Sequence, residues 1–247
     1  MRGLARLTLT EFLLELREPF SAFFSLVFPP LLVVVFGSIY GNAPRPQSGG
    51  LGIIDLTVPG YIAMVIATVA VFNLPIALAT YRERGVLRQL AVAPVSPVAL
   101  FASQLAARAV LSALGISLLL LTAELGYGLR FAGSLPSALA AGILGFLAMM
   151  AFGFALAALV PSARTALVVA FVVFYPMLFF SGMALPPEIL PERVRQVAEF
   201  LPATPIVTLL HAAWTAEPWS DHWRALLLLA AWTAGSLATA IWRFRWQ

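Results

Sequence analysis

Residues 56–80, LTVPGYIAMVIATVAVFNLPIALAT, decide the fold of this 247-residue chain. These 25 residues carry no charged side chain, and about 20 mostly apolar residues are enough for a helix to cross the roughly 30 Å hydrocarbon core of a bilayer. The whole chain is 61% apolar and 11% charged, whereas soluble domains are about 45–50% apolar and about 25% charged. The composition therefore predicts an integral membrane protein rather than a soluble domain.

Five more stretches of the sequence can cross a membrane in the same way. They are residues 20–40, 97–123, 135–160, 165–184 and 225–242, and Arg108 is the one charged residue within the six spans. The fold class that we predict is all-α, with six transmembrane helices in a single transmembrane domain over residues 1–247. Its parts are residues 1–19, the first five spans over 20–184, an outer segment over 185–224, and the last span over 225–242.

The arginines predict the orientation of the spans, because short loops rich in Lys and Arg stay in the cytoplasm. With the N-terminus inside, more arginines fall on the inner side than on the outer side. The inner ones are Arg2, Arg6, Arg17, Arg82, Arg84, Arg88, Arg164, Arg243 and Arg245, and the outer ones are Arg45, Arg130, Arg193, Arg195 and Arg224. We therefore expect a multi-pass protein of the cell membrane with both termini in the cytoplasm.

The segment before the first span has the pattern of an amphipathic helix. Its apolar residues follow the i, i+3, i+4, i+7 spacing of one helical face, and they are Leu9, Phe12, Leu13 and Leu16. Pro19 predicts a break before the first span. We expect residues 1–19 to form a helix along the inner membrane surface, and the alternative is a cytosolic extension of the first span.

Prolines inside three of the predicted spans indicate local distortion. Pro29 and Pro30 lie in the first span, Pro75 in the second and Pro176 in the fifth. Each proline removes a backbone donor, so we expect the helix to kink or unwind locally. The alternative is that they only bend the helices, as many transmembrane prolines do.

Two missing residue types exclude several kinds of chemistry. The chain has no cysteine, so it has no thiolate metal site and no cysteine nucleophile, and it has no lysine, which the phosphate-binding loop of many ATPases requires. The two histidines, His211 and His222, lie near Glu217 and Asp221 in the sequence, but their spacing matches no familiar metal motif. We predict no catalytic residue, no metal site and no cofactor in this chain, so any ATP must bind to another subunit.

Arg108 is the one charge that the spans must accommodate. It lies eleven residues after Pro97, from where a long side chain can reach the inner surface. The six predicted spans contain no Asp, Glu or His, so they offer Arg108 no acidic partner. We therefore expect its side chain to extend to the inner surface or to pack against neighbouring helices. The alternative is an ion pair across a dimer. Spans without acidic residues also argue against a proton-coupled carrier.

The loop between spans two and three is the most charged part of the chain. It reads YRERGVLRQL over residues 81–90, and Val86, Leu87 and Leu90 form an apolar patch among its charges. A short amphipathic helix of this kind can dock into a groove on a partner. The alternative is a positively charged loop that only fixes the orientation of the spans.

The segment 185–224 predicts two short helices on the outer side. The first follows Pro191, and it places Val194, Val197, Ala198 and Leu201 on one face before Pro202 ends it. The second starts at Thr204 as N-cap with Pro205 in the first turn. Both helices are too short to span a membrane, so we expect a re-entrant or interfacial hairpin. The alternative is an ordinary outer loop on the bilayer surface.

Two sequence patterns make the chain similar to a known family. The first is Glu83-Arg84-Gly85-x-Leu87-Arg88-Gln89-Leu90 with Ala93-Pro94. The second is Phe180-Ser181-Gly182, then Pro186, Leu190-Pro191 and Leu201-Pro202-x-Thr204-Pro205. With six spans of this length, the chain resembles the permease subunits of type-two ABC exporters, and its Thr204-Pro205 variant is closest to permeases that export drugs and natural products.

The resemblance implies roles for particular residues. ATPase coupling would fall to Arg82, Glu83, Arg84, Gly85, Leu87, Arg88, Gln89 and Leu90, and an outer re-entrant hairpin would include Gly182, Pro186, Pro191, Pro202, Thr204 and Pro205. A substrate path lined by spans one, two and five would include Phe28, Phe72, Phe174 and Phe180. Residues 1–19 would form the family's connecting helix, which also touches the ATPase.

The resemblance also implies an assembly and a function. It implies a dimer of two permease copies in the bilayer, identical or paralogous, with ATPase subunits that bind ATP and Mg, and it implies no nucleic acid. The expected function is ATP-driven export of an amphiphilic or hydrophobic drug or natural product, as in drug efflux and resistance. A lipid or lipid-linked glycan is the alternative substrate, and secondary transport is a poorer fit.

Overall fold

The computed structural model describes residues 2–86, 97–184 and 190–243, and their regular structure is entirely helical. Its elements are α1 (Arg2–Leu16), α2 (Pro19–Ala22), η1 (Phe23–Val27), α3 (Phe28–Tyr40), η2 (Pro46–Ser48), α4 (Ile53–Thr68), η3 (Val69–Asn73), α5 (Leu74–Glu83), α7 (Pro97–Tyr127), α8 (Leu135–Leu159), α9 (Ala163–Phe180), α10 (Glu192–Ala198), α11 (Thr204–Trp214), η5 (Trp219–His222) and α12 (Trp223–Arg243). Six helical segments in the described ranges are long and apolar enough to cross a membrane. The prediction of an all-α protein with six spans is confirmed.

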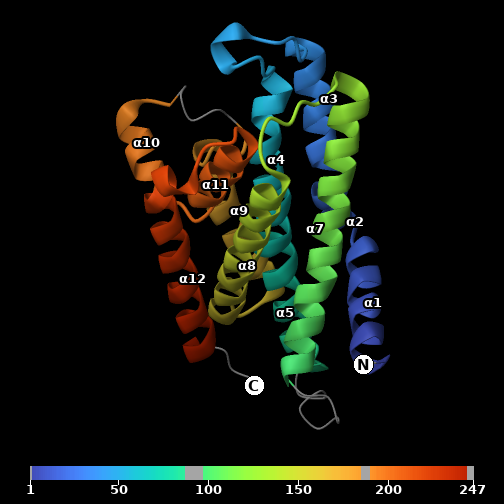
Figure 1. Cartoon of the computed structure of the whole chain (residues 1–247). Coiled ribbons are helices and arrows are strands. Elements are labelled where there is room, and N and C mark those ends of the chain that lie inside the picture. The colour runs from blue at the N-terminus through green and yellow to red at the C-terminus, as the bar shows by residue number, and fades with distance from the viewer. Residues whose placement is uncertain (1, 87–96, 185–189, 244–247) are drawn as a thin grey trace.

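The second span forms the centre of the bundle. It runs through α4, η3 and α5, and it contacts α3, α7, α8, α9 and α11. Most of its side chains are buried, including Met64, Val65 and Leu74. Small residues let neighbouring helices come close: a Cβ on Gly145 of α8 would lie 2.5 Å from the side chain of Ile206 in α11. Figure 1 shows both termini at the same end of the bundle, as an even number of spans requires.

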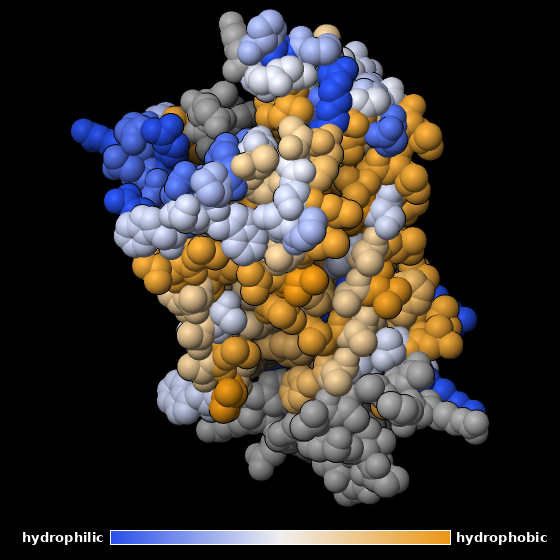
Figure 2. Space-filling view, viewed as in Figure 1, coloured by the Kyte–Doolittle hydropathy of each residue, from blue (hydrophilic) through white to orange (hydrophobic). Residues whose placement is uncertain are grey.

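The outer surface of the bundle is apolar, as a bilayer requires. Leu125 on α7 and Ile241 on α12 are 83% and 80% exposed. Figure 2 shows apolar side chains over the middle of the visible face, with polar residues gathered toward the end that carries η2 and α10. This distribution reverses that of a soluble protein, because the surrounding lipid is itself apolar.

Prolines coincide with π-helical turns in the first two spans. The turn η1 ends just before Pro29 and Pro30, and η3 ends two residues before Pro75. A proline cannot donate to the preceding turn, and a π-turn is one way in which a helix accommodates the missing donor. The expected local unwinding is confirmed at these two places. In the fifth span, by contrast, α9 stays α-helical through Pro176.

Asp55 joins the α3–α4 connection to the α7–α8 connection at the end of the bundle opposite the termini. Its Oδ1 atom accepts hydrogen bonds from the Asn42 side chain and the Arg130 backbone N–H, both at 2.8 Å, and its Oδ2 atom accepts from Gly52 N–H at 2.7 Å. Asp55 is 0% exposed and stands in the first turn of α4, where a carboxylate also favours the helix dipole. The second span thus begins earlier than predicted and includes a buried acidic residue.

Asp55→Asn is expected to destabilise the chain by about 1–3 kcal/mol, because its amide NH₂ would face N–H donors that now bond a carboxylate. The measurement is the thermal unfolding of the purified chain in mild detergent. Asp221→Asn is the matched control, since Asp221 is exposed and, among the described residues, its carboxylate accepts a hydrogen bond from the neighbouring Ser220 alone. Equal unfolding temperatures for the two variants would show that the Asp55 contacts add no stability.

Candidate functional site

A buried polar cluster lies between α1, α7 and the two π-turns. It consists of Glu11, Glu15, Ser25, Asn73, Tyr81, Gln104 and Arg108. Arg108 is 0% exposed, so of the two expected outcomes the side chain packs inside the bundle and does not extend to the inner surface. The physical reason is an acidic partner: Glu15 Oε1 lies 2.8 Å from Arg108 Nη2. Glu15 belongs to α1, which precedes the first predicted span.

The Arg108 guanidinium contacts three elements at once. Its Nη2 atom pairs with Glu15 of α1 and also donates to the backbone oxygen of Asn73 in η3, at 3.3 Å. Its Nη1 atom donates to the backbone oxygen of Gln104, one turn earlier on α7, at 3.2 Å, and to the Gln104 side chain. The planar guanidinium suits such a position, because it presents several donors in a fixed geometry.

The face of α1 that enters the bundle carries acidic side chains beside Phe12 and Leu16, which are half-buried against the core. Glu11 and Glu15 are both 7% exposed, while Leu9 and Leu13 of the predicted apolar stripe are 57% and 44% exposed. The Tyr81 hydroxyl of α5 donates to Glu11 Oε2 at 2.7 Å. Burial raises the pKa of Glu15 above its ordinary value and nearby Glu11 adds to this, while the positive charge of Arg108 acts in the opposite direction.

The helix α1 was predicted to lie along the inner membrane surface, and in the structure it packs against α7. Figure 1 shows α1 beside α7 and along the bundle rather than across its end. Leu9 and Leu13 point away from the bundle, while Glu11 and Glu15 point into it. An apolar outer face of this kind is compatible with contact to lipid. A location at the inner membrane surface stays a prediction. The i, i+4 spacing of Glu11 and Glu15 places both on one helical face, and this pattern could have indicated the buried face from the sequence.

Arg82 and Glu83, predicted to couple to the ATPase, bind the turn between α8 and α9. Arg82 donates to Val160 O at 2.8 Å and to Ala157 O at 3.0 Å, while Glu83 Oε1 accepts from Ala163 N–H at 3.0 Å. A cation thus meets the C-terminal end of α8, and an anion meets the N-terminal end of α9, as helix dipoles favour. These contacts fix the end of the second span against the neighbouring turn.

The remaining coupling residues continue from this end of α5. Gly85 adopts φ +68°, and its N–H donates to Arg82 O at 3.1 Å, which ends the helix. Arg84 follows the helix and is exposed. Leu87, Arg88, Gln89 and Leu90 lie outside the described residues. Contact with an ATPase stays a prediction for the whole segment.

The outer segment contains the two expected short helices, α10 and α11. Thr204 is the first residue of α11 rather than its N-cap, and its hydroxyl donates to Ala198 O at the end of α10, at 2.5 Å. Pro202 and Pro205 are both buried, and most of α11 packs between α4, α8 and α12. The four residues predicted on one face all line a single cavity beside α9, and they are Val194, Val197, Ala198 and Leu201. Val197 is nevertheless 72% exposed, whereas Ala198 is buried. A re-entrant course through the membrane stays a prediction.

The remaining predicted hairpin residues lie around the end of α9. Gly182 follows α9 with φ +83°, and its backbone oxygen would lie 2.5 Å from a Cβ on Gly60 of α4. Ser181 is buried next to it, and Pro191 precedes α10 as its N-cap. Pro186 lies outside the described residues. The close backbone approach of Gly182 and Gly60 anchors the outer segment to the central span.

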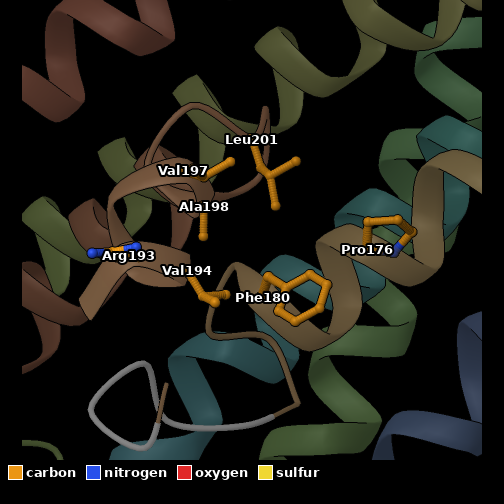
Figure 3. A pocket seen from close by; sticks show the side chains of 7 residues that line it. All are labelled: Pro176, Phe180, Arg193, Val194, Val197, Ala198 and Leu201. Carbon is orange, nitrogen blue, oxygen red and sulfur yellow. The ribbon is translucent and has the colours of Figure 1, made fainter. Parts of the chain in front are cut away.

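An apolar cavity of about 400 Å³ lies between the end of α9 and α10. Figure 3 shows its lining residues, which are Pro176, Phe180, Arg193, Val194, Val197, Ala198 and Leu201. Phe180 is 40% exposed. Of the other residues predicted on a substrate path, Phe72 and Phe174 are each 4% exposed and meet edge to face with ring centroids 5.1 Å apart. Phe28 is half-buried beside Phe24. Their place on a path stays a prediction.

The histidines form no metal site within the described ranges. His222 and Glu217, which are close in the sequence, are also in contact in the structure: His222 Nε2 lies 2.9 Å from Glu217 Oε2. No group of three or more potential protein ligands is present in the part of the chain that the structure describes.

The sequence was compared with models of known protein families and with curated proteins. A model of the ABC-2 type transporter family matches residues 3–214, which include α1, the first five spans and both short outer helices. No curated protein matches the chain.

Proposed function

The chain belongs to the ABC-2 type transporter family, and we propose that it is the transmembrane subunit of an ATP-driven exporter. The family match over residues 3–214 is the observation that carries this proposal. The chain supplies the route across the membrane, and a separate ATPase subunit binds ATP and Mg. The absence of lysine from the sequence supports this division, because a phosphate-binding loop needs its lysine.

The assembly that we propose contains two permease copies and two ATPase subunits. A homodimer is the simplest arrangement, with the substrate path between the copies. The termini lie at one end of the bundle, near the Arg82–Glu83 contacts on the α8–α9 turn. We place this end in the cytoplasm, because most loop arginines belong to that side.

The proposed substrate is amphiphilic or hydrophobic, such as a drug or natural product. Exposed aromatic side chains support this choice: Phe23 is 42% exposed on η1, and Tyr175 and Phe179 are 44% and 45% exposed on α9. The apolar cavity beside Phe180 adds a second apolar surface near the outer segment. A lipid or lipid-linked glycan offers a similar apolar body, so it remains the alternative substrate class.

The coupling role of residues 81–90 can be separated from a purely topological one. The double change Leu87→Ser and Leu90→Ser keeps every arginine, so insertion and orientation should be unchanged. If apolar side chains provide the docking energy, binding of the ATPase and ATP-driven transport should fall together. Co-purification of the ATPase with the double variant, beside an orientation assay, measures this.

The control for the double variant is Leu125→Ser, at an exposed position on the far end of α7. It should retain the ATPase at the wild-type level. If only the loss of Arg82, Arg84 and Arg88 matters, through altered topology, the two leucines have no coupling role. Wild-type ATPase binding and transport in the correctly oriented double variant would establish that result.

A further inference from the structure

The π-turns of the first two spans face each other and are joined by a hydrogen bond. Asn73 Nδ2 in η3 donates to Ser25 Oγ in η1 at 3.3 Å. Ser25 is 0% exposed and Asn73 is 7% exposed, so this contact lies inside the bundle. The distorted turns of two different spans therefore meet at one point.

Each π-turn presents a backbone oxygen that its own helix cannot fully satisfy. For Ser25 O the α-helical and π-helical donors would be residues 29 and 30, which are both prolines. For Ala70 O the π-helical donor would be Pro75, and the Leu74 N–H already bonds Val69 O. Helices with missing backbone bonds bend more easily than continuous ones.

Glycines from neighbouring helices pack directly on these two oxygens. A Cβ on Gly115 of α7 would lie 2.4 Å from Ser25 O, and one on Gly153 of α8 would lie 2.2 Å from Ala70 O. The close approach leaves each π-turn held by backbone packing. A change of shape at either π-turn would therefore disturb its packing against the neighbouring helix.

Arg108 connects the same region to α1. Its Nη2 atom pairs with Glu15 at 2.8 Å and donates to Asn73 O at 3.3 Å. Asn73 in turn bonds Ser25, so one continuous series of polar contacts runs from α1 through α7 and η3 to η1. Glu15, Arg108, Asn73 and Ser25 are its four members, and we name it the α1–π-turn link.

We propose that Arg108 is a positioning residue for transport, which transmits a displacement of α1 through the α1–π-turn link so that the first and second spans change shape together. The proposal rests on the proposed function, because it needs ATP-driven movement of the permease. Its physical basis is the rigid planar guanidinium, whose Nη2 atom forms an ion pair with Glu15 and donates a hydrogen bond to Asn73 O. The competing explanation is that Arg108 only neutralises the buried charge of Glu15.

Arg108→Lys separates the two explanations. The ammonium of lysine keeps the positive charge near Glu15, but it lacks the planar guanidinium that holds both partners together. If Arg108 only neutralises Glu15, the variant should transport normally. If it transmits movement, the complex should still assemble and hydrolyse ATP, while substrate transported per ATP falls at least about fivefold, the low end of typical coupling between sites.

Ser25→Ala tests the far end of the link without changing any charge. It removes the acceptor of the Asn73 side chain and should also lower transport per ATP. Ser38→Ala is the control on the same span, because within the described residues the Ser38 hydroxyl bonds Val34 O and Val35 O of its own helix. The measurement uses the full complex of permease and ATPase in proteoliposomes. Should Arg108→Lys fail to assemble, Ser25→Ala decides.

A spectroscopic measurement follows the movement itself. The chain has no cysteine, so single spin labels can be placed at Leu9→Cys on α1 and at Val27→Cys in η1, which are 57% and 49% exposed. Both spectra should change between the nucleotide-free and the ATP-trapped complex. In Arg108→Lys the Leu9 label should still respond, and the Val27 label should not.

The outcomes distinguish this inference from the proposed function. Normal transport per ATP in both Arg108→Lys and Ser25→Ala, with the Val27 label responding in Arg108→Lys, would overturn the inference and leave an ATP-driven permease intact. A wild-type complex without any ATP-dependent transport would overturn the proposed function itself, and the inference with it.

Discussion

Arg108→Gln is expected to lower the free energy of unfolding by about 3–5 kcal/mol, the usual cost of breaking a buried ion pair by removing one partner. The cost arises because Glu15 would stay buried without the guanidinium 2.8 Å away. The backbone oxygen of Asn73 would lose a donor in the same change. The measurement is the unfolding of the purified variant in mild detergent, together with the amount of folded chain recovered from membranes.

The double variant Glu15→Gln and Arg108→Gln is the control for this prediction. Replacing both charges removes the unpaired carboxylate, so much of the lost stability should return. The difference between the single and double variants measures the coupling between the two residues. A single Arg108→Gln variant as stable as the wild type would contradict the ion pair described above.

Gly153→Ala is expected to destabilise the bundle by about 1–3 kcal/mol or more through overpacking. The added methyl group would lie 2.2 Å from Ala70 O and 3.0 Å from the Leu74 side chain. The nearer atom belongs to the backbone of the central span, so it cannot move aside as a flexible side chain can. The loss should appear both in the unfolding temperature and in the yield of monodisperse protein.

Gly142→Ala is the matched control in the same helix. No atom lies within 4 Å of a Cβ at Gly142, and alanine is favoured over glycine inside a helix by roughly 0.5–1 kcal/mol. Since no other helix of the described residues approaches this position within 4 Å, the control should be neutral or slightly stabilising. If both variants behave alike, the close packing of α8 on η3 does not contribute to stability.

Hydropathy predicted the spans well because each must cover the bilayer with apolar residues. The ends were less certain: the second span extends from Ile53 to Glu83 and not from residue 56 to residue 80. Helix ends depend on capping contacts such as that of Asp55 with Gly52, whose effect extends beyond the apolar run. Composition also could not show that Pro75 follows a π-turn while Pro176 lies in a continuous α-helix.

Arg108 shows why the candidate site was harder to predict than the fold. Its acidic partner Glu15 lies in α1, which precedes the first predicted span. The predicted apolar stripe of α1 is divided, because Phe12 and Leu16 pack against the core beside the buried Glu11 and Glu15, while Leu9 and Leu13 are exposed. With these acids and Asp55 buried, the argument against a proton-coupled carrier from acid-free spans no longer holds. Membership of the ABC-2 type family now supports ATP-driven transport instead.

Arg82 and Glu83 show a similar limit at the other charged segment. Their charges led to the prediction that they contact an ATPase. In the structure their side chains bind the ends of α8 and α9. Such contacts between distant parts of the sequence are not visible in a local pattern. The sequence could predict that this segment is important, and the structure shows that its first two charges position the second span.

The most direct test of ATP-driven transport with a separate ATPase is flux in proteoliposomes with and without that subunit. The purified chain alone should show no ATP-dependent movement of an amphiphilic dye, because it lacks the lysine of a phosphate-binding loop. Addition of the co-purified ATPase should produce movement that requires ATP and Mg. Movement driven by ATP in vesicles that contain this chain alone would contradict the account.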